Sequence, residues 1–297
     1  MKYELNEDQL FLPAQAALNN LTLKQLLDKF KVSKKLQHIY RQEKRILVND
    51  QITSYQDTVL TNKSVTILLP KQEIDWALSS KEACVVYESK FVLIVHKPKG
   101  IIIHSHKQDV NCLNAMVARY YFNHHQHIYI RPIHRLDRDT CGLVFYAKIP
   151  FFQAYFDEAI KQKEIIRTYY AICLGPKPKV ACFTINDPIA KDRHQQGLYR
   201  ISKHGKQAKT ICKYVSQYKN YSLFECQLLS GRTHQIRVHL KAHNYPIIND
   251  LNYGVYRSNL SQMGLFAIKI KFKNPITHKS HTIYDKIILE KILLEDY

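Results

Sequence analysis

Two acidic residues, Asp137 and Asp139, lie in a stretch with three arginines that continues into an apolar segment, RPIHRLDRDTCGLVFYAK (residues 131–148). An aspartate beside a fixed guanidinium stays ionised, because the positive neighbour lowers its pKa. A permanently ionised, oriented carboxylate suits nucleophilic or electrostatic work at a ribose or a base, whereas a general acid needs a raised pKa. An ordinary Asp–Arg pair that braces two strands would account for the same residues equally well.

Glycines mark where such residues could meet. The chain has only 8 glycines, and four of them, Gly100, Gly142, Gly231 and Gly254, each lie at an end of a strand candidate. A tight turn at such a place sets the neighbouring side chains at a cleft. Asp137 precedes Gly142 and Arg232 follows Gly231, so the two turns bring a carboxylate and a guanidinium forward as candidates for one site.

The elements that must position these residues form a mixed order of strands and helices. The apolar strand candidates are FVLIVHK, GLVFYAK, TYYAICLG, YSLFECQLL, LFAIKIKF and HTIYDKIILE. The helix candidates are CLNAMVARYYF, PFFQAYFDEAIKQK and the segment around THQIRVHLKAH. Because strands and helices do not alternate regularly, the pattern predicts an α+β fold with a large, mostly antiparallel sheet flanked by helices.

A separate basic segment precedes this part of the chain. Residues 21–49 show apolar residues at helical spacing in two short runs, with Ser33 as the N-cap of the second, and strand candidates RILVND and SVTILLP follow. Eight basic and two acidic residues between Lys24 and Arg45 give a local net charge of +6. Positive charge of this density favours contact with the phosphate backbone of a nucleic acid such as RNA. The cations that we expect to make this contact are Lys34, Lys35, Arg41, Lys44, Arg45 and, later in the chain, Arg135. A solvated charged face is the alternative reading.

These observations divide the chain into four parts. We expect an N-terminal arm at residues 1–15, a small basic module at 16–72, a linker at 73–82 and a catalytic domain at 83–297. Because the strand set of the last part is complete without the others, we also expect it to fold alone when residues 1–72 are deleted.

The composition restricts the partners. A net charge of +19 favours phosphate backbones or an anionic membrane surface, but no apolar run approaches the roughly 20 residues that span a bilayer. The 7 cysteines are scattered without a C-x-x-C pair, which is typical of reduced thiols in a cytoplasmic protein. The histidines lack the spacing of a zinc site, and no G-x-G-x-x-G is present for a dinucleotide. We therefore expect neither metal nor nucleotide cofactor.

Four stretches resemble the motifs of the RluA-type pseudouridine synthases. HRLDRDTCG resembles the H-R-L-D-x-x-T-S-G signature, and LLSGRTHQIRVHLKAHNYPIINDLNYG resembles the second long motif of the family. VVYESKFVLIVHKPKGIIIHS is similar to the entry segment, and IIRTYYAICLG to the K-x-Y-x-A-x-V-x-G strand. The matches occur in family order. Residues 21–70 separately resemble the alpha-L RNA-binding module of the ribosomal protein S-four type.

The resemblance implies an enzyme that converts uridine in RNA to pseudouridine without a cofactor. By position it places the family's aspartate at Asp137, its active-site tyrosine at Tyr169 and the arginine that pairs with the aspartate at Arg232. It implies that Asp137 acts as nucleophile or charge stabiliser and that Tyr169 stacks under the base. Asp139 falls on a variable position, which implies a solvated surface acid.

The chain departs from the family motifs at four positions: Cys141 for Ser, Asn249 for Gly, Phe266 for His and Ser105 for Pro. Asparagine tolerates left-handed backbone better than most residues, so we expect the turn at Asn249 to survive. None of these positions is one of the three chemical residues, so the departures bear on substrate choice rather than on activity.

The substrate expected from this reading is ribosomal RNA of the large subunit, modified by a monomer in the cytoplasm. A tRNA pseudouridine synthase of the same family is one alternative. A non-catalytic RNA-binding or ribosome-assembly factor is another alternative. The presence of Asp137, Tyr169 and Arg232 argues against it, because a protein without catalytic activity would not need to retain them.

Overall fold

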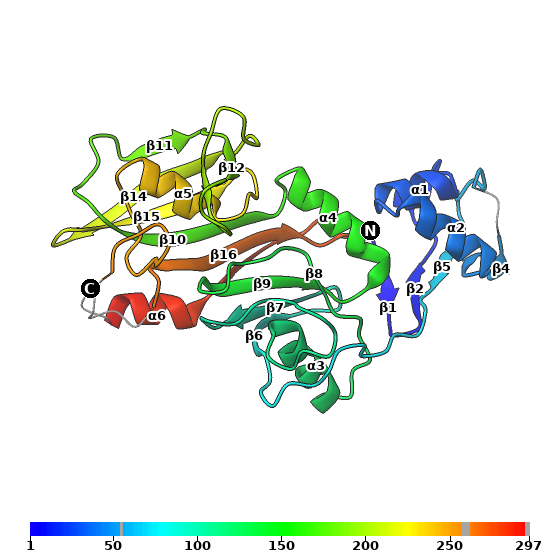
Figure 1. The fold of residues 1–297 in the computed structure, drawn as a ribbon. Helices are drawn as coiled ribbons and strands as arrows, with labels where there is room; N and C mark the ends of the chain where they lie inside the picture. Colours follow the sequence, from blue (N-terminus) through cyan, green and yellow to red (C-terminus); the bar gives the residue numbers. More distant parts are fainter. Residues whose placement is uncertain (54–55, 257–261, 295–297) are drawn as a thin grey trace.

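The computed structural model describes residues 1–53, 56–256 and 262–294. Figure 1 shows a small N-terminal module beside helix α4, at one end of a much larger sheet. The module begins with β1 (Glu4–Leu5), β2 (Gln9–Leu12), the 3-10 helix η1 (Ala16–Leu18), α1 (Leu23–Lys29) and α2 (Lys34–Gln42). It ends with β3 (Ile46–Val48), β4 (Gln51–Ile52) and β5 (Val65–Leu68), and its strands pair in the order β1-β2-β5-β3-β4.

Both helices of the module begin at capping side chains. The Thr22 hydroxyl accepts a hydrogen bond from the backbone N–H of Gln25, whose side chain reciprocally binds the N–H of Thr22, a capping box. The Ser33 hydroxyl accepts from the N–H of Leu36, so the predicted cap of the second helix is confirmed.

The segment 1–15 differs from the expectation of a separate arm. Its strand β2 pairs with β5 along the register from Gln9↔Leu68 to Leu12↔Val65, which makes it part of the module's sheet. The physical reason is the period-2 pattern of QLFL: Leu10 and Leu12 are fully buried, while the alternating residues are half-buried.

The larger part begins with β6 (Cys84–Glu88), β7 (Val92–Lys97), α3 (Leu113–Asn123), β8 (Arg131–Pro132), β9 (Cys141–Ala147), the 3-10 helix η2 (Pro150–Phe152) and α4 (Gln153–Lys161). It continues with β10 (Ile166–Leu174), β11 (Cys182–Ile185), β12 (Ile189–Lys191), β13 (Tyr199–Ile201), β14 (Thr210–Tyr218) and β15 (Tyr221–Leu228). It ends with α5 (Gln235–Ala242), β16 (Leu265–Lys273), β17 (Ser280–Tyr284) and α6 (Lys286–Leu294).

One sheet runs through this part in the order β11-β14-β15-β10-β16-β9-β7-β6, with β17 on β16 and β8 on β9, while β12 and β13 form a separate hairpin. Its pairs are antiparallel except β16 with β9, which is parallel. The predicted α+β class with a mostly antiparallel sheet is therefore confirmed.

The side chains of strand β9 pack in a hydrophobic cluster on each face of the sheet. Leu143, Phe145 and Ala147 pack in the cluster that includes η2 and α4, whereas Val144 and Tyr146 pack in the cluster that includes α3 and α5. A strand covered on both faces reads as a continuous apolar run, which explains why GLVFYAK was recognisable in the sequence.

Gly142 permits the parallel contact at the centre of the sheet. It pairs with Ala267 of β16, has a φ of +115°, and an added Cβ would lie 2.2 Å from the carbonyl oxygen of Ala267. Only glycine fits such an approach. The residue therefore sets strand β9 against β16 directly after the loop that carries Asp137.

The last strand predicted from the sequence is correct in its first half, whereas its second half is a helix. HTIYDKIILE divides at Asp285, where β17 has ended and α6 begins. The fully buried Asp285 accepts a hydrogen bond from the backbone N–H of Ile288 and contacts His96 Nδ1 at 2.7 Å. A capping aspartate starts a helix, and it overrides the strand propensity of the apolar residues after it.

The module and the larger part share one hydrophobic core. Phe30 of the module lies edge-on to Phe151 and Phe152 of η2, with ring centroids 6.1 and 5.5 Å apart. The ring centroids of Tyr40 and Phe151 are 5.6 Å apart, and those of Tyr3 and Phe91 are 5.4 Å apart. This continuity argues against the expectation that the catalytic part folds alone, because deletion of the module would expose these rings. Residues 73–82 form neither helix nor strand.

Candidate active site

Asp137 lies in the loop between β8 and β9, at the wall of a cleft of about 730 Å³. Its side chain is 27% exposed. The cleft is lined by Ile102, Ile103, His104, Ile133, His134, Arg135, Leu136, Asp137, Ile160, Lys161, Lys163, Ile165, Arg167, Tyr169, Leu228, Leu229, Ser230, Gly231, Arg232 and Thr233. All three residues proposed for catalysis thus line one cleft, although they come from three separate segments.

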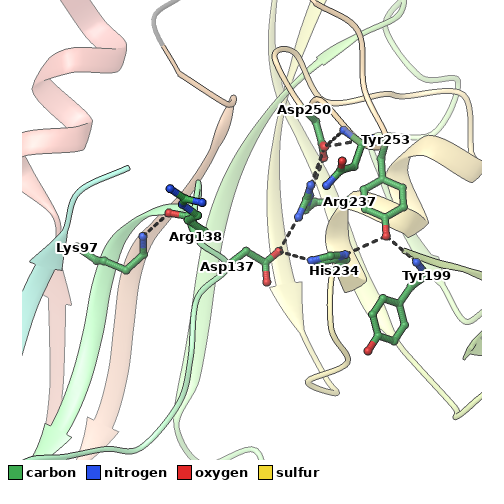
Figure 2. Close-up of polar contacts among 9 residues, drawn as sticks. Lys97, Asp137, Arg138, Tyr199, His234, Arg237, Asp250 and Tyr253 are labelled. Atoms are coloured by element: carbon green, nitrogen blue, oxygen red, sulfur yellow. Dashed lines mark hydrogen bonds and ion pairs between the residues drawn. The ribbon is translucent and has the colours of Figure 1, made fainter. Parts of the chain in front are cut away.

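The partner of Asp137 is Arg237, and the predicted pairing with Arg232 is wrong. Arg237 Nη1 donates to Asp137 Oδ2 at 3.1 Å (Figure 2). The side chain of Arg232 is instead exposed, and its Nε donates to the carbonyl oxygen of Gln207 at 2.9 Å. Arg232 lies in the loop before α5, whereas Arg237 lies inside the helix, whose first turn points it at the carboxylate.

Arg237 is held in place by Asp250, which sequence reasoning missed. Nε and Nη2 of Arg237 donate to the two carboxylate oxygens of Asp250, each at 2.7 Å. Burial alone would lower the pKa of the Arg237 guanidinium, but the hydrogen bonds and the negative charges of Asp250 and Asp137 raise it overall. The guanidinium therefore stays charged and is fixed as a planar fork.

The carboxylate of Asp250 also organises its own turn. Its Oδ1 accepts hydrogen bonds from the backbone N–H groups of Asn252 and Tyr253, each at 3.1 Å. The ring of Tyr253 lies under the guanidinium of Arg237, with 4.9 Å from the ring centroid to Cζ. Both Arg237 and Asp250 stand inside the long motif quoted from the sequence, so the motif could have identified them where spacing alone could not.

His234 approaches the same oxygen of Asp137 from a second side. Its Nε2 lies 3.9 Å from Asp137 Oδ2, and its Nδ1 lies 2.9 Å from the hydroxyl of Tyr253. That hydroxyl accepts a hydrogen bond from the N–H of Tyr199 at 2.7 Å, as Figure 2 shows. Burial lowers the pKa of His234 despite the negative charge of Asp137, so the imidazole is neutral near pH 7.

Both neighbours of Asp137 thus contact Oδ2. For Oδ1, no hydrogen bond is found to any residue that the structure describes. A carboxylate that is oriented through one oxygen and unpaired at the other suits attack on, or stabilisation of, a positive centre in the cleft.

Tyr169 lies on β10 and is 3% exposed. Burial raises the pKa of its phenol, which the charge of Arg167 lowers and that of Asp137 raises, so the phenol is protonated near neutral pH. A register shift in the β10–β16 pairing falls between Thr168 and Tyr169. Tyr169 also lines a smaller hollow beside the cleft together with Asp137, Arg232 and Arg237, so its ring lies next to the carboxylate.

Lys97 supports the loop from behind. The fully buried side chain donates from Nζ to the carbonyl oxygens of Pro98, Ile101 and Arg138 at 2.8, 2.7 and 2.8 Å. Burial lowers the pKa of Lys97 to about 8, although Cys141, Asp139 and Asp137 oppose this shift. The ammonium therefore ties the turn after β7 to the residue that follows Asp137.

The cations expected to contact RNA lie in two places. Lys34, Lys35 and Lys44 are exposed on the N-terminal module. Arg41 donates to the carbonyl oxygen of Gln37 at 3.3 Å, and Arg45 forms an ion pair with Glu43. Arg135 is exposed and lines the cleft, whereas the exposed Asp139 does not line it.

The departures from the family motifs lie around the site. Asn249 adopts a φ of 54°, the left-handed conformation expected of it. Cys141 is buried, and its thiol donates to Gln262 Oε1 at 3.6 Å. Phe266 is 1% exposed. Ser105 is exposed. Among the described residues no three His, Cys, Asp or Glu side chains are grouped to hold a metal ion, and no described helix has the length and apolar character to cross a membrane.

Comparisons with known proteins agree with this geometry. Residues 91–242 match the family RNA pseudouridylate synthase, and residues 12–65 match the RluD ribosomal pseudouridine synthase N-terminal domain. The uncharacterized RNA pseudouridine synthase YhcT of Bacillus subtilis is 32% identical over 251 residues, which cover 83% of each chain. Ribosomal large subunit pseudouridine synthase D of Buchnera aphidicola is 32% identical over 258 residues, 80% of this chain and 76% of the relative.

Solved structures share the fold. The structure of human RNA Pseudouridylate Synthase Domain Containing 4 superposes with a TM-score of 0.56 at 19% identity and covers 68% of this chain and 87% of its own. At this identity the likeness shows the fold alone.

Proposed function

The chain belongs to the RNA pseudouridylate synthase family, and from this premise we propose that it isomerises uridines of large-subunit ribosomal RNA, in the cytoplasm, with Asp137 as the reacting carboxylate. The family membership makes it an isomerase that acts on RNA. The RNA class is suggested by relatives such as ribosomal large subunit pseudouridine synthase D.

The observation that carries the assignment of Asp137 is its asymmetric environment. Oδ2 is held by Arg237 at 3.1 Å, and the cleft lies beside Tyr169. The target base must leave its stack before its N-glycosidic bond can be reached. With the base on the ring of Tyr169, the N-glycosidic bond breaks and positive charge develops at the ribose. Asp137 either bonds to the ribose carbon as a nucleophile or stabilises this charge. The uracil leaves with the electrons of the broken bond, turns, and bonds through its carbon 5 to the same carbon of the ribose. Carbon 5 then loses its proton to solvent and N1 takes one up, so the product is an isomer of the substrate.

The positive residues serve delivery of the RNA rather than the chemistry. Arg135, Lys161, Lys163 and Arg232 line the cleft, and phosphate contacts of this kind position a nucleic acid without reading its sequence. Arg232 keeps a proposed role here, as an RNA-facing cation instead of the partner of Asp137. Single-stranded or loop uridines are the expected targets, since they unstack most easily.

Asp137→Asn tests the catalytic assignment, with Asp139→Asn as the matched control. Asparagine keeps the size of aspartate and removes its charge, so we expect Asp137→Asn to abolish pseudouridine formation but to retain RNA binding. Asp139→Asn should keep most of the activity. Tritium release from carbon-5-labelled uridine in RNA measures turnover, beside a binding titration. An active Asp137→Asn, or an inactive Asp139→Asn, would show that the assignment is wrong.

The substrate class needs its own experiment. Pseudouridines are mapped in ribosomal and transfer RNA from cells that lack the protein and from cells complemented with the parent chain or with Asp137→Asn. Loss of a large-subunit site that only the parent chain restores supports the proposal. Loss confined to tRNA would favour the tRNA enzyme, and no change in either RNA would favour a non-catalytic assembly factor.

A further inference from the structure

Arg167 is a cleft residue with no role in the contacts described above. It lies on β10, two residues before Tyr169, and lines the same cleft. Its Nε is buried without a hydrogen-bond partner, and within the described ranges no ion pair or hydrogen bond is found for its guanidinium. A buried donor without a partner destabilises the fold, and more so when it is charged, so an unpaired guanidinium at this place needs an explanation.

The protein around Arg167 does not offer the anion that it needs. The charge of Asp137 is engaged with Arg237 at 3.1 Å. Burial, reinforced by the charge of Arg167, lowers the pKa of His134 to about 3, so its imidazole is neutral and cannot compensate the guanidinium. Among the described residues that line the cleft, Asp137 is the only carboxylate, against five lysines and arginines: Arg135, Lys161, Lys163, Arg167 and Arg232.

The neighbour of the Arg167 guanidinium in the cleft is a residue without a side chain. Gly231 faces it, and even a Cβ added at Gly231 would stay 3.9 Å from Arg167 Nη2, its nearest neighbour. Gly231 therefore adds no side chain over the guanidinium, which lines the cleft that would receive a ligand. A planar fork of this kind matches the oxygens of a phosphate.

We propose that Arg167 binds the backbone phosphate next to the uridine that Tyr169 receives. Residues two apart on a strand are about 6.6 Å apart and face the same side. A nucleotide whose base meets Tyr169 therefore has an adjacent phosphate within reach of Arg167. The inference rests on the proposed function, in which this cleft receives RNA. Arg167 acts as a binding residue, distinct from the pair Asp137–Arg237.

The first test uses the intact chain and the oligonucleotide dodecauridylate, so that it does not depend on turnover. Affinity is measured against KCl concentration for the parent, Arg167→Gln, Arg167→Lys and the control Lys271→Gln. Lys271 is an exposed cation of β16 that does not line the cleft. Loss of one phosphate contact on a single strand should reduce the slope of log affinity against log salt by about 0.7.

We expect this reduction for Arg167→Gln alone, with the parent slope kept by Arg167→Lys, which retains the charge, and by Lys271→Gln. Circular dichroism and thermal unfolding establish that each variant is folded. A parent-like slope for Arg167→Gln would overturn the proposal, and so would an equal loss in Arg167→Lys, because that result would indicate a structural effect of the substitution.

The second test locates the phosphate. Synthetic stem-loops carry the uridine found by mapping, either with natural linkages or with one neutral methylphosphonate on its 5′ or 3′ side. One of the two modified RNAs should bind the parent about tenfold more weakly, whereas for Arg167→Gln the same modification should cost no further affinity. If, at both linkages, the methylphosphonate weakens binding by Arg167→Gln as much as it weakens binding by the parent, the two effects are independent and the proposal is overturned. Failure of the proposed function appears separately, as no isomerisation of the natural stem-loop by the parent chain.

Discussion

The assignment of Arg237 as the partner of Asp137 leads to a comparison of Arg237→Lys with Arg232→Lys. The Arg237 guanidinium makes three hydrogen bonds at once, two at 2.7 Å to Asp250 and one at 3.1 Å to Asp137. A lysine keeps the positive charge but presents a point charge on a flexible stem. It cannot satisfy both oxygens of the buried Asp250 and also reach Asp137, so the carboxylate that reacts would lose its orientation.

The magnitude follows from the bonds that are lost. One charge-assisted hydrogen bond is worth about 1.5–3 kcal/mol, which converts to a rate loss of roughly 10- to 150-fold if it is needed in the transition state. Loss of one of the two bonds to Asp250, which is 2% exposed, should also destabilise the fold by about 1–3 kcal/mol. Arg232 Nε donates to the carbonyl oxygen of Gln207 and not to Asp137, so Arg232→Lys should lose less turnover and little stability.

Single-turnover tritium release at saturating enzyme measures the chemical step for both variants, and urea unfolding at the assay temperature establishes that Arg237→Lys is folded. The reasoning is refuted if Arg237→Lys reacts within twofold of the parent. It is also refuted if Arg232→Lys is the more impaired variant, since the partner inferred from the sequence would then be the right one.

Two further predictions concern stability. Deletion of residues 1–72 should lower the unfolding temperature or make the protein aggregate, because it exposes the rings of Phe151 and Phe152. Burial of each ring stabilises the fold by about 1.5–3 kcal/mol. A truncated chain that unfolds at the parent temperature would contradict the shared core. In the folded chain the pKa of Lys97 is about 8, below the ordinary value of about 10.4. Between about pH 8 and pH 10.4 the unfolded chain therefore binds more protons at Lys97 than the folded chain does, so the free energy of unfolding should rise with pH. Urea titrations at pH 7 and 10 should show an increase about 2–3 kcal/mol larger for the parent than for Lys97→Met, and equal increases would show that Lys97 does not titrate in this range.

Much of the fold could be predicted because the relevant signals are local. The apolar run GLVFYAK became β9, and the capping residue Ser33 began α2 where expected. The errors arose where a capping residue or a distant strand overrides a local pattern. Asp285 turns an apolar run into the start of α6, and the short alternating segment QLFL joins the sheet of the module through the distant strand β5.

The site could be predicted only in part, because its contacts join distant residues. Asp137 and Tyr169 were identified from motifs, and they do line one cleft. The choice between Arg232 and Arg237 depends on where α5 begins relative to the carboxylate, since five residues separate a loop arginine from a helical one. The left-handed φ of 56° at His234 is the backbone feature that starts the helix in this direction, and no periodicity in the sequence reveals it.

The departures from the family motifs can be understood from the same geometry. Asn249 stands where the motif has glycine, but its φ of 54° is one that asparagine tolerates, and its N–H donates to the carbonyl oxygen of Val255 at 2.7 Å. The turn therefore still presents Asp250 to Arg237. Cys141 and Phe266 are paired neighbours at the parallel junction of β9 and β16, where they pack instead of contacting Asp137. Ser105 is exposed. Because the other three changes fall on a turn or on the junction of β9 and β16, Asp137, Arg237 and Asp250 keep their contacts, and the chain can vary around them without losing the oriented carboxylate.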